Sequence, residues 1–588
     1  MTYQAPVNDI MFALKIAADL GPSIESGVYP ALDIDTIEAV ISEAGKFGGD
    51  VLAPLRWIGD RTGSKLADGA VTTAPGFRDA YRQFTDAGWN ALPGPEAFGG
   101  QGLPEIVASA VCEIWNSSNM GFALCPLLTQ GAIHALEVGG SDALKSIYLP
   151  NLVAGRWTGT MNLTEPHAGS DLSALRTKAV RDTGGNYRIT GTKIFISYGE
   201  HDLAENIIHL VLARLSDAPP GTHGISLFLV PKFLVNDDGS LGARNDVVCA
   251  GIEHKLGIHA SPTCVMKFGE NDGAVGYLIG EENHGLATMF VMMNAARLAV
   301  GMQGVAVAES ATQQAMQFAK DRTQGHGVSA ATAHMSPIIE HADVRRMLLS
   351  MKSQTQAARM ICFATARAHD AANTATDKAS RRVALHRTAL LTPIAKAYAT
   401  DVGVDVASLG IQVHGGVGYV EETGAAQHLR DARILPIYEG TNGIQAIDLV
   451  TRKLPLDDGN VVNGYLVELA KIAAEVRASN RPDLGRTGDR LAEAIRDLQA
   501  ATEWMVDAVR NNQPSALAGA TPYLRLFSVT AGAAYLAKGA IQSETGASAV
   551  SLARFYAENI LTQSHGLAEA ITTGAESVLV EYDAEVFA

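Results

Sequence analysis

The chain has 588 residues, of which 47% are hydrophobic and 18% charged, and its formal net charge is −16. A chain of this length is expected to form two to four domains with well-buried cores. Its acidic balance, without any Lys/Arg-rich run, excludes a general electrostatic affinity for nucleic acid or an anionic membrane. A phosphate-bearing ligand must therefore be held locally, by single cationic side chains, backbone N–H groups and helix ends.

The cysteines and the apolar runs indicate in which cellular compartment the protein is expected. The five cysteines are scattered without a C-x-x-C pair, so we expect buried free thiols in a reducing environment and neither a disulfide framework nor a metal site. The N-terminal residues lack a basic segment followed by an apolar core, which argues against a secretory signal. No uninterrupted apolar run reaches about 18 residues, so no membrane span is expected. The sequence predicts a cytoplasmic protein.

The first 156 residues have the pattern of a helical domain with an N-terminal extension. A segment rich in Gly and Thr at 61–75 is expected to be a loop or ribbon. Asn8 or Asp9 is expected to cap the first helix. The predicted helices cover 7–14, 35–47, 77–87, 104–118 and 129–138.

From Trp157 the hydrophobic period changes from 3.6 to 2, which predicts a β-domain at 157–280. Segments 178–181 and 187–190, separated by Asp-Thr-Gly-Gly and Asn, are expected to form a hairpin. A small barrel or sandwich is the expected architecture. The other predicted strands cover 158–164, 206–215, 224–230, 264–268 and 274–279.

Helical periodicity returns at 281–455 and predicts a bundle of long helices. Residues 455–463 are expected to be a linker. Beyond it, 456–588 is expected to be an extra C-terminal helical domain for packing or interaction, without catalytic residues. The chain is thus predicted to be mainly α with a central β-domain. The expected helices are 284–320, 338–369 and 382–409, followed by 466–476, 490–509, 522–541 and 547–570.

The segment 430–445 delivers one carboxylate, Glu439, just ahead of a predicted helix start. Thr441 or Asn442 can cap that helix, whose apolar residues recur at helical spacing. A Glu in such a loop can be aimed at a buried ligand. Alternatively, it only places negative charge near a helix N-terminus, where such charge is favourable.

Two further segments have the composition of ligand loops. Residues 163–171 join a strand to a turn rich in Gly, Ser and Asp, which leaves backbone N–H groups and two hydroxyls exposed, although an ordinary polar turn has the same composition. Residues 410–419 end a helix with glycines that let backbone approach a ligand closely. No G-x-G-x-x-G follows a predicted strand, which argues against a Rossmann nicotinamide site.

Residues 437–441 (Ile-Tyr-Glu-Gly-Thr) resemble the catalytic-base loop of acyl-CoA dehydrogenases, and further motifs of that family precede them in the right order. The resemblance covers about residues 80–455 with five ordered motifs. The chain resembles the long form of the family, which has an extra C-terminal helical domain. Within that form it is most similar to the broad-range dehydrogenases and the 3-methylmercaptopropionyl-CoA dehydrogenases. This resemblance implies an N-terminal helical domain, a small β-barrel or sandwich and a helical bundle.

The first flavin motif is T-E-P-x-x-G-S-D, which residues 164–171 resemble at every fixed position. By this resemblance Met161, Leu163 and Thr164 contact the isoalloxazine of FAD. Ser170 then lies towards the pyrophosphate or towards the entry of the CoA thioester.

The second flavin motif is K-x-W-I-T, which residues 193–197 resemble. It implies that Phe195 packs beside the flavin and that the hydroxyl of Ser197 bonds its edge. Phe replaces the usual Trp, which loses an indole N–H but keeps a flat apolar wall. A Phe in a strand can equally be a core residue.

Two motifs imply a flavin shared between subunits. Arg322 stands in a segment like D-R-x-Q-F-G, where Arg holds the FAD pyrophosphate of the neighbouring subunit, but the Phe after Gln is missing here. Residues 340–342 (Glu-His-Ala) replace the frequent E-H-Q. Gln412, Gly415 and Gly416 match the Q-x-x-G-G-x-G-Y motif that receives the ADP part of FAD. The resemblance therefore implies a homodimer or a dimer of dimers.

Substrate and further cofactor contacts are implied as well. Asn294 and Arg297 match the helix that faces the CoA portion, with a plain salt bridge of Arg297 as the alternative. Tyr438 is expected to wall the acyl pocket, and Gly440 to leave space for the thioester. Ser170 is a candidate on the substrate side too, and Thr441 is expected to contact the cofactor.

The implied reaction is the FAD-dependent α,β-dehydrogenation of an acyl-CoA thioester to the trans-2-enoyl-CoA. Glu439 is the implied base, and flavin N5 the implied hydride acceptor. The backbone N–H of Glu439 and the flavin ribityl 2′-hydroxyl are implied donors to the enolate oxygen. Apolar surroundings are expected to raise the pKa of Glu439. Electron-transfer flavoprotein is the expected acceptor, and 3-methylmercaptopropionyl-CoA or a fatty acyl-CoA the expected substrate, in fatty acid metabolism or dimethylsulfoniopropionate degradation.

Three alternatives remain at this level. An acyl-CoA oxidase would share the first half of the reaction and pass electrons to O₂. A DNA-associated flavoprotein of the same fold would need a basic C-terminal face, whereas the last 120 or so residues interleave Glu and Asp with few Lys or Arg. A non-catalytic assembly partner is the third, against which an intact Glu439 counts.

Overall fold

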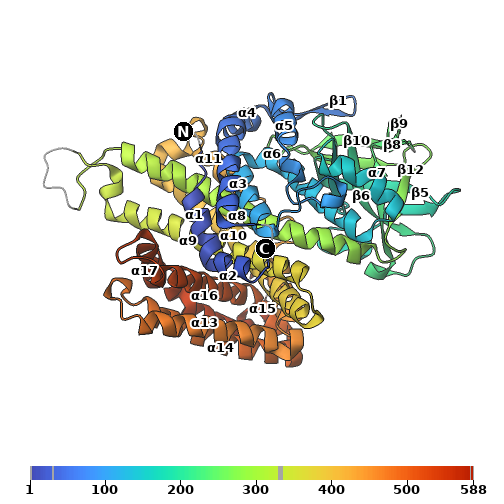
Figure 1. Ribbon diagram of the computed structural model, residues 1–588. Coiled ribbons are helices and arrows are strands. Elements are labelled where there is room, and N and C mark those ends of the chain that lie inside the picture. Colours follow the sequence, from blue (N-terminus) through green and yellow to red (C-terminus); the bar gives the residue numbers. More distant parts are fainter. Residues whose placement is uncertain (1–2, 30–31, 237, 329–334, 583, 587–588) are drawn as a thin grey trace. The chain divides into compact units, whose positions relative to one another are not determined.

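The computed structural model describes residues 3–29, 32–236, 238–328, 335–582 and 584–586 (Figure 1). These residues form two compact units, and we name each by its main content. The β-domain unit comprises residues 3–5 together with 43–299. The bundle unit comprises 6–42 together with 300–588.

The helical part of the β-domain unit confirms one predicted break and adds helices that the sequence did not predict, α4 and α7. The helical run α6 is broken at Asn119 (φ −160°, ψ 89°), so the predicted helix end at 118 is confirmed, but the second helix follows this break directly and does not wait until 129. The Asn119 side-chain oxygen accepts the Phe122 N–H at 3.1 Å and so restarts the helix after the kink. The 61–75 segment contains the expected ribbon, β1 with β2. The elements are α4 (Ala53–Thr62), β1 (Lys65–Ala67), β2 (Ala70–Thr72), α5 (Phe77–Asp86), α6 (Glu105–Gly139) and α7 (Asp142–Val153).

The strands of this unit close into a barrel. β5 pairs with β12, β12 with β7, β7 with β6, β6 with β4, and β4 again with β5. β3 pairs in parallel with β6, and β11 and β10 extend the sheet from β5. The sequence missed three strands, β8, β9 and β10. The strands are β3 (Trp157–Asn162), β4 (Lys178–Arg181), β5 (Tyr187–Ser197), β6 (Asn206–Leu215), β7 (Ile225–Pro231), β8 (Phe233–Val235), β9 (Leu241–Arg244), β10 (Val247–Ile252), β11 (Thr263–Phe268) and β12 (Ala274–Ile279).

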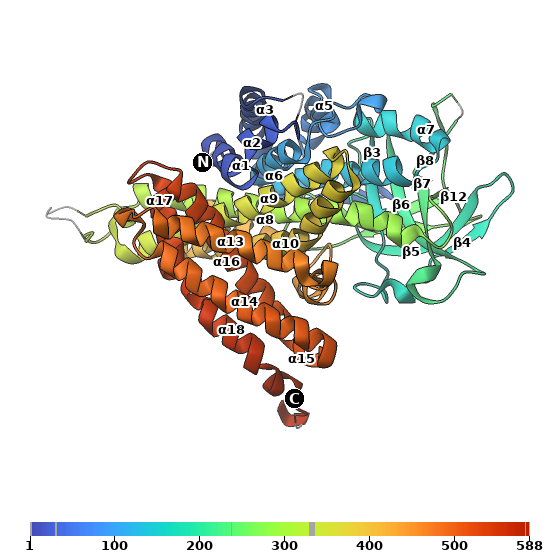
Figure 2. The same ribbon diagram turned by 60° about the horizontal axis from the view of Figure 1, so that its bottom comes forward.

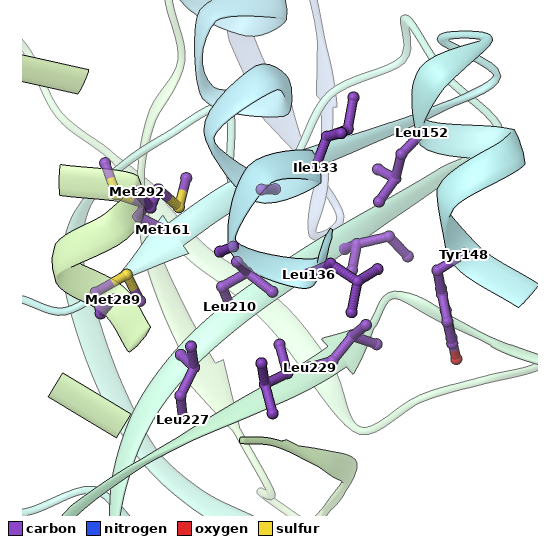
Figure 3. Close-up of a cluster of buried hydrophobic side chains, with 14 of the residues drawn as sticks. Ile133, Leu136, Tyr148, Leu152, Met161, Leu210, Leu227, Leu229, Met289 and Met292 are labelled. Carbon is purple, nitrogen blue, oxygen red and sulfur yellow. The ribbon is translucent and has the colours of Figure 1, made fainter. Parts of the chain in front are cut away.

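A cluster of buried side chains joins α6 and α7 to one face of the strands (Figure 3). Gly159 of β3 lets α6 approach the sheet closely, since a Cβ there would lie 2.3 Å from the Cβ of Ala132. Burial of this apolar surface, at about 25 cal/mol per Å², is the main force that holds the helices on the barrel. The labelled members are Ile133, Leu136, Tyr148, Leu152, Met161, Leu210, Leu227, Leu229, Met289 and Met292.

The long helices of the bundle unit pack through small residues. A Cβ at Gly304 of α8 would lie 2.2 Å from the carbonyl oxygen of Ala399 on α10, so these two backbones almost touch. The expectation that Asn8 or Asp9 caps α1 is wrong, because α1 begins at Val7 after Pro6 and has no side-chain cap. The end of α3 from residue 43 and the start of α8 up to residue 299 belong to the β-domain unit. The elements are α1 (Val7–Ala17), α2 (Leu20–Glu25), α3 (Ile34–Phe47), α8 (Gly285–Asp321), α9 (Ala342–Thr374), α10 (Lys378–His414), α11 (Ala425–Ala432) and α12 (Asn442–Asp448).

The C-terminal residues of the bundle unit form further packed helices, as expected (Figure 2). α13 already begins at Asn460, so the non-helical part of the expected linker 455–463 ends at Gly459; within it Asp457 and Asp458 have left-handed backbone. The expected helix 547–570 is interrupted by a 3₁₀ turn at Leu561–Gln563. The helices are α13 (Asn460–Ala478), α14 (Thr487–Asn511), α15 (Gln513–Ala518), α16 (Ala520–Ile541), α17 (Ser548–Asn559), α18 (Ser564–Thr573) and α19 (Ala575–Leu579).

Helix α8 is the one described helix that is long and apolar enough to cross a membrane, with a mean hydropathy of 1.3 over 18 residues. Because 53% of that window is buried inside the protein, this is weak evidence for a span. The five cysteines are free thiols; four are buried and Cys112 is partly exposed.

Candidate active site

Glu439 lies in the loop between α11 and α12 on an unusual backbone. Its φ is 55° and that of Gly440 is 85°, so two consecutive residues are left-handed. Thr441 caps α12, with its hydroxyl oxygen accepting the Ile444 N–H at 3.2 Å, which confirms one of the two caps that the sequence predicted. Tyr438, Glu439 and Gly440 are all half-buried. The carboxylate therefore belongs to a loop with a defined conformation.

Buried polar side chains that the sequence did not point to hold this loop. The Tyr438 hydroxyl donates a hydrogen bond to Oε1 of Gln303, a fully buried residue of α8. Nζ of Lys396, also fully buried, donates to the Gly440 carbonyl oxygen at 2.9 Å. Gln445 donates to the same oxygen at 3.2 Å.

In the β-domain unit, the two flavin motifs lie side by side. The N–H of Ile194 donates to the carbonyl oxygen of Thr164 at 3.0 Å. The hydroxyl of Thr160 on β3 donates to the carbonyl oxygen of Ser197 on β5 at 2.8 Å. The structure therefore brings residues 163–164 next to 193–197, although the strand order could not be read from the sequence.

Phe195 is displayed on the surface of β5. Its φ is 60°, and 59% of the residue is exposed. The pairing of β5 with β11 shifts register here, between Cys264 and Met266, so the strand bulges and turns one side chain outward. A buried core position, the alternative left open by the sequence, does not apply to Phe195.

A buried ion pair supports the turn after β3. Nζ of Lys193 lies 2.8 Å from Oε1 of Glu165 and also donates to the Leu163 carbonyl oxygen at 3.0 Å. Burial lowers the pKa of Lys193 to about 8, and Glu165 acts against this. Burial raises the pKa of Glu165, but Lys193 and hydrogen-bond donors outweigh it and the net shift is downward. No motif in the sequence indicates this pairing, whose partners lie 28 residues apart.

The remaining candidates of this unit differ in exposure. Ser170 is exposed in the turn. Met161 is 7% exposed and belongs to the core cluster, where its side chain lies beside Met289 and Met292 (Figure 3). On α8, Arg297 is 6% exposed and its Nη1 donates to Oδ1 of the exposed Asn294 at 3.3 Å.

In the bundle unit, the predicted nucleotide residues gather at one end of α8 and α10. The ring of Phe318 stacks on that of His414, with centroids 4.4 Å apart, and burial lowers the pKa of His414. The exposed Arg322 follows one turn after Phe318. Gly415 and Gly416 follow His414 and are exposed, with no atom within 4 Å of the place a Cβ would take. Gln412 is exposed too.

Four segments of the chain match families by sequence. They are described as the N-terminal, middle and C-terminal domains of acyl-CoA dehydrogenase, at 65–156, 160–270 and 283–454, and as "Acetyl-CoA dehydrogenase C-terminal like", at 467–580.

Several characterised proteins are similar over most of the chain. A 3-methylmercaptopropionyl-CoA dehydrogenase of Ruegeria pomeroyi is 46% identical over 98% of this chain and 99% of its own length. A butyryl-CoA dehydrogenase of Syntrophomonas wolfei is 38% identical, over 80% and 79%. A broad-specificity linear acyl-CoA dehydrogenase of Mycobacterium tuberculosis is 33% identical, over 84% and 82%.

Solved structures share the fold. Caenorhabditis elegans ACDH-11, in complex with C11-CoA, superposes with a TM-score of 0.78 at 20% identity, over 99% of this chain and 96% of its own. An acyl-CoA dehydrogenase of Bacillus anthracis, complexed with FAD, gives a TM-score of 0.73 at 20% identity, over 95% and 91%.

Proposed function

Because this chain belongs to the acyl-CoA dehydrogenase family, whose members carry out FAD-dependent dehydrogenation of acyl-CoA thioesters, we propose that Glu439 is its catalytic base. The observation that carries this proposal is the backbone of Glu439. A non-glycine residue at φ 55° costs about 1–2 kcal/mol, and such strain is typically retained at functional sites. The carboxylate is held on a loop fixed by buried hydrogen-bond partners from three helices: Gln303 of α8 accepts from Tyr438, and Lys396 of α10 and Gln445 of α12 donate to Gly440.

The residues present fit FAD. An outward aromatic ring at Phe195, beside the half-buried Ser197, suits a flat ring system with polar edges. The open backbone at Gly415 and Gly416, with the exposed guanidinium of Arg322 close by in the fold, suits a phosphate-bearing group. We propose that Met161, Leu163, Thr164 and Ser170 also hold the cofactor, together with Gln412 and Thr441.

Two groups of Glu439 would act together when the α-proton of the substrate is removed. Glu439 accepts the proton on a carboxylate oxygen, and its backbone N–H donates to the thioester carbonyl oxygen, where negative charge develops. Tyr438 and Gly440 flank the carboxylate and shape the acyl site, while Asn294 and Arg297 bind the CoA portion. Bound FAD supplies the acceptor for the β-hydrogen, which leaves as hydride.

For the substrate we propose 3-methylmercaptopropionyl-CoA. Support comes from the Ruegeria pomeroyi relative, which matches this chain from end to end at 46% identity, whereas the butyryl-CoA and linear acyl-CoA dehydrogenases match about four fifths of it at 38% and 33%. This assigns the chain to dimethylsulfoniopropionate degradation. Assay of 3-methylmercaptopropionyl-CoA against butyryl-CoA and longer linear acyl-CoA esters tests it, and higher kcat/KM for a linear ester would contradict it.

For the acceptor and assembly we propose electron-transfer flavoprotein and a cytoplasmic homodimer or dimer of dimers. A solved structure from a study of the electron-transferring flavoprotein of Acidaminococcus fermentans supports the acceptor; it has a TM-score of 0.58 at 26% identity. We also propose four domains, at 1–156, 157–280, 281–455 and 456–588. The matched family segments, which change at nearly the same places, support this division.

The base is tested by Glu439→Gln, which keeps size and hydrogen bonding but removes the proton acceptor. Anaerobic bleaching of the flavin by acyl-CoA should slow by about two to four powers of ten, with FAD content and thermal midpoint little changed. Glu439→Asp should retain partial activity. Bleaching of the Gln variant at the wild-type rate would show that another group takes the proton.

A further inference from the structure

The loop that carries Glu439 is strained, although the Asn442 N–H closes it by donating to the Pro436 carbonyl oxygen at 3.0 Å. Glu439 and Gly440 are both left-handed, with φ of 55° and 85°. Glycine adopts this region freely, but a residue with a Cβ does so at a cost of about 1–2 kcal/mol. Such strain persists only where the surroundings hold it, so contacts from outside the loop are expected to add to its own hydrogen bond.

Lys396 supplies the strongest of these contacts. It stands in the interior of α10, is fully buried, and donates from Nζ to the Gly440 carbonyl oxygen and to Oδ1 of Asn442, both at 2.9 Å. Hydrogen bonds from an ammonium group are roughly twice as strong as neutral ones. Gln445, also fully buried, adds donations to the carbonyl oxygens of Gly440 at 3.2 Å and Glu439 at 3.5 Å.

Asn442 ties the other side of the loop to the same turn of α10. Its Nδ2, which has two N–H groups to share among these acceptors, lies 3.1 Å from the Ala397 carbonyl oxygen, 3.0 Å from the Thr400 hydroxyl and 2.7 Å from Oδ1 of Asp401. One amide side chain thus engages residues 397–401 while it also accepts from Lys396. The end of the loop therefore moves only if α10 moves.

After Glu439 in the chain, Lys396 and Gln445 hold the carbonyl oxygens of residues 439 and 440. Before it, Gln303 accepts a hydrogen bond from the Tyr438 side chain. Peptide planes are rigid, so these restraints limit the rotation of the Tyr438–Glu439 peptide between them. That peptide carries the N–H proposed to polarise the thioester. We propose that Lys396 is a positioning residue that, with Gln445, aims the N–H and the carboxylate of Glu439 at the thioester.

This inference rests on the proposed role of Glu439 and concerns how that role is achieved. A buried Lys could instead serve only the stability of the bundle. The two roles differ in measurable ways, because a misaimed N–H lowers the stabilisation of an enolate even when the protein stays folded and loaded with FAD. A displacement of about 1 Å in a reacting group can cost about a hundredfold in rate.

The test uses the full-length, FAD-loaded chain and the variants Lys396→Met and Gln445→Met. Acetoacetyl-CoA, which is not dehydrogenated, serves as the probe, and the long-wavelength absorption of its bound enolate is titrated with pH. The pH at which half of the bound acetoacetyl-CoA is present as the enolate is the enolate midpoint. It should rise in both variants, by about one pH unit for Lys396→Met. Bleaching by acyl-CoA should slow about 10- to 100-fold for Lys396→Met and less for Gln445→Met.

Lys538→Met is the matched control. Nζ of Lys538 also donates to one backbone carbonyl, that of Ile16 at 2.9 Å, and to one side chain, Asp19 at 2.5 Å, but these lie on the N-terminal helices. This variant should lower the thermal midpoint without moving the enolate midpoint. Hydrogen exchange in the peptide containing residues 438–442 should quicken only in Lys396→Met and Gln445→Met.

An unchanged enolate midpoint in Lys396→Met, or an equal shift in Lys538→Met, would overturn the inference. If Lys396→Met does not fold, Gln445→Met decides by the same criterion. Failure of the proposed function is separate: it would show as normal bleaching by Glu439→Gln. Loss of bleaching in that variant together with normal behaviour of the Lys396 and Gln445 variants would refute only the positioning role.

Discussion

The ammonium nitrogen of Lys193 lies 2.8 Å from Oε1 of Glu165, and the two side chains are only 0% and 2% exposed. Glu165 accepts further bonds from the Thr177 hydroxyl at 2.6 Å and from two backbone N–H groups. The negative charge of Glu165, in the turn that follows β3, is therefore balanced by Lys193 of β5. Glu165 is committed to this network, which leaves it poorly placed to replace Glu439 as a base.

Lys193→Met should release FAD and destabilise the protein. Removing one partner of a buried pair leaves the other charge uncompensated, at a cost of about 3–5 kcal/mol. It also deletes the bond to the Leu163 carbonyl, which fixes the proposed flavin strand. Thermal unfolding and the FAD-to-protein absorbance ratio measure the two effects.

A control variant and a double variant separate the effect of Lys193→Met on stability from its effect on FAD binding. Lys267→Met removes an ion pair of equal length, 2.8 Å, between side chains that are 40% and 49% exposed, and should change stability by less than about 1 kcal/mol. The double variant Lys193→Met with Glu165→Met should recover stability, since buried pairs are often replaceable by apolar residues. It should still bind FAD poorly. Full FAD content in either Lys193 variant would contradict a role in holding the flavin strand.

Phe195→Gly should weaken FAD binding without unfolding the β-domain unit. Glycine relieves the strain at φ 60°, and its larger unfolded-state entropy costs about 0.5–1 kcal/mol, so the two effects nearly cancel. Loss of an aromatic ring against the flavin should weaken binding about tenfold. Titration of the apoprotein with FAD measures this. Phe195→Trp should restore affinity, and an unchanged dissociation constant in the Gly variant would show that the ring faces something else.

Ionised Glu309 should account for part of the loss in the free energy of unfolding at acid pH. It is paired with the buried Arg359 at 2.8 Å. Burial tends to raise its pKa, but the charges of Lys352 and Arg359 and hydrogen bonds lower it from 4.5 to about 2. A lowered folded-state pKa stabilises the protein above the unfolded pKa, and this contribution, about 3 kcal/mol, is lost as pH falls from about 4.5 to 2.

In Glu309→Gln, chemical unfolding at a series of pH values should show lower stability at pH 7 and a flatter decline between about pH 5 and 2. Glu468→Gln, at a side chain that is 56% exposed, is the control and should keep the wild-type profile. If the free energy of unfolding of Glu309→Gln falls with pH in parallel with that of the wild type, Glu309 does not cause the acid-induced loss of stability.

Strongly periodic segments made much of the fold readable from the sequence. Residues 206–215 and 274–279 were predicted as strands and are β6 and β12 without change. β8 and β9 were missed because they are short and partly exposed and carry little alternation. The break of α6 at Asn119 was predicted, but the early start of its second half was missed, because that start is made by the Asn119 side chain, a local event without periodic signal.

The candidate site was predictable where its residues form contiguous motifs. The left-handed backbone of Glu439 and Phe195 was not, since neither is a residue type that favours φ above zero. Lys396 and Gln303 were missed for another reason. Each is a polar residue within a mainly apolar stretch of its helix, and its partner lies 44 or 135 residues away. Such pairs exist only once the helices have packed.

The proposed sharing of FAD between subunits predicts complementation between two inactive variants. Arg322 is exposed, and no other described residue pairs with its guanidinium. If it serves the partner's flavin, Arg322→Glu damages the neighbouring site, whereas Glu439→Gln damages its own. A heterodimer of the two therefore contains one site with both defects and one site with neither. Two different affinity tags allow this heterodimer to be purified after co-expression.

The doubly purified heterodimer should regain about half of the wild-type activity per dimer, since one of its two sites is intact. Each variant alone, carried through the same two tags as a homodimer, should stay nearly inactive and provides the baseline. If Arg322 acted within its own chain, each site of the heterodimer would hold one defect, and activity would not exceed that baseline. The same purification also tests assembly, because a monomeric enzyme would yield no protein that carries both tags.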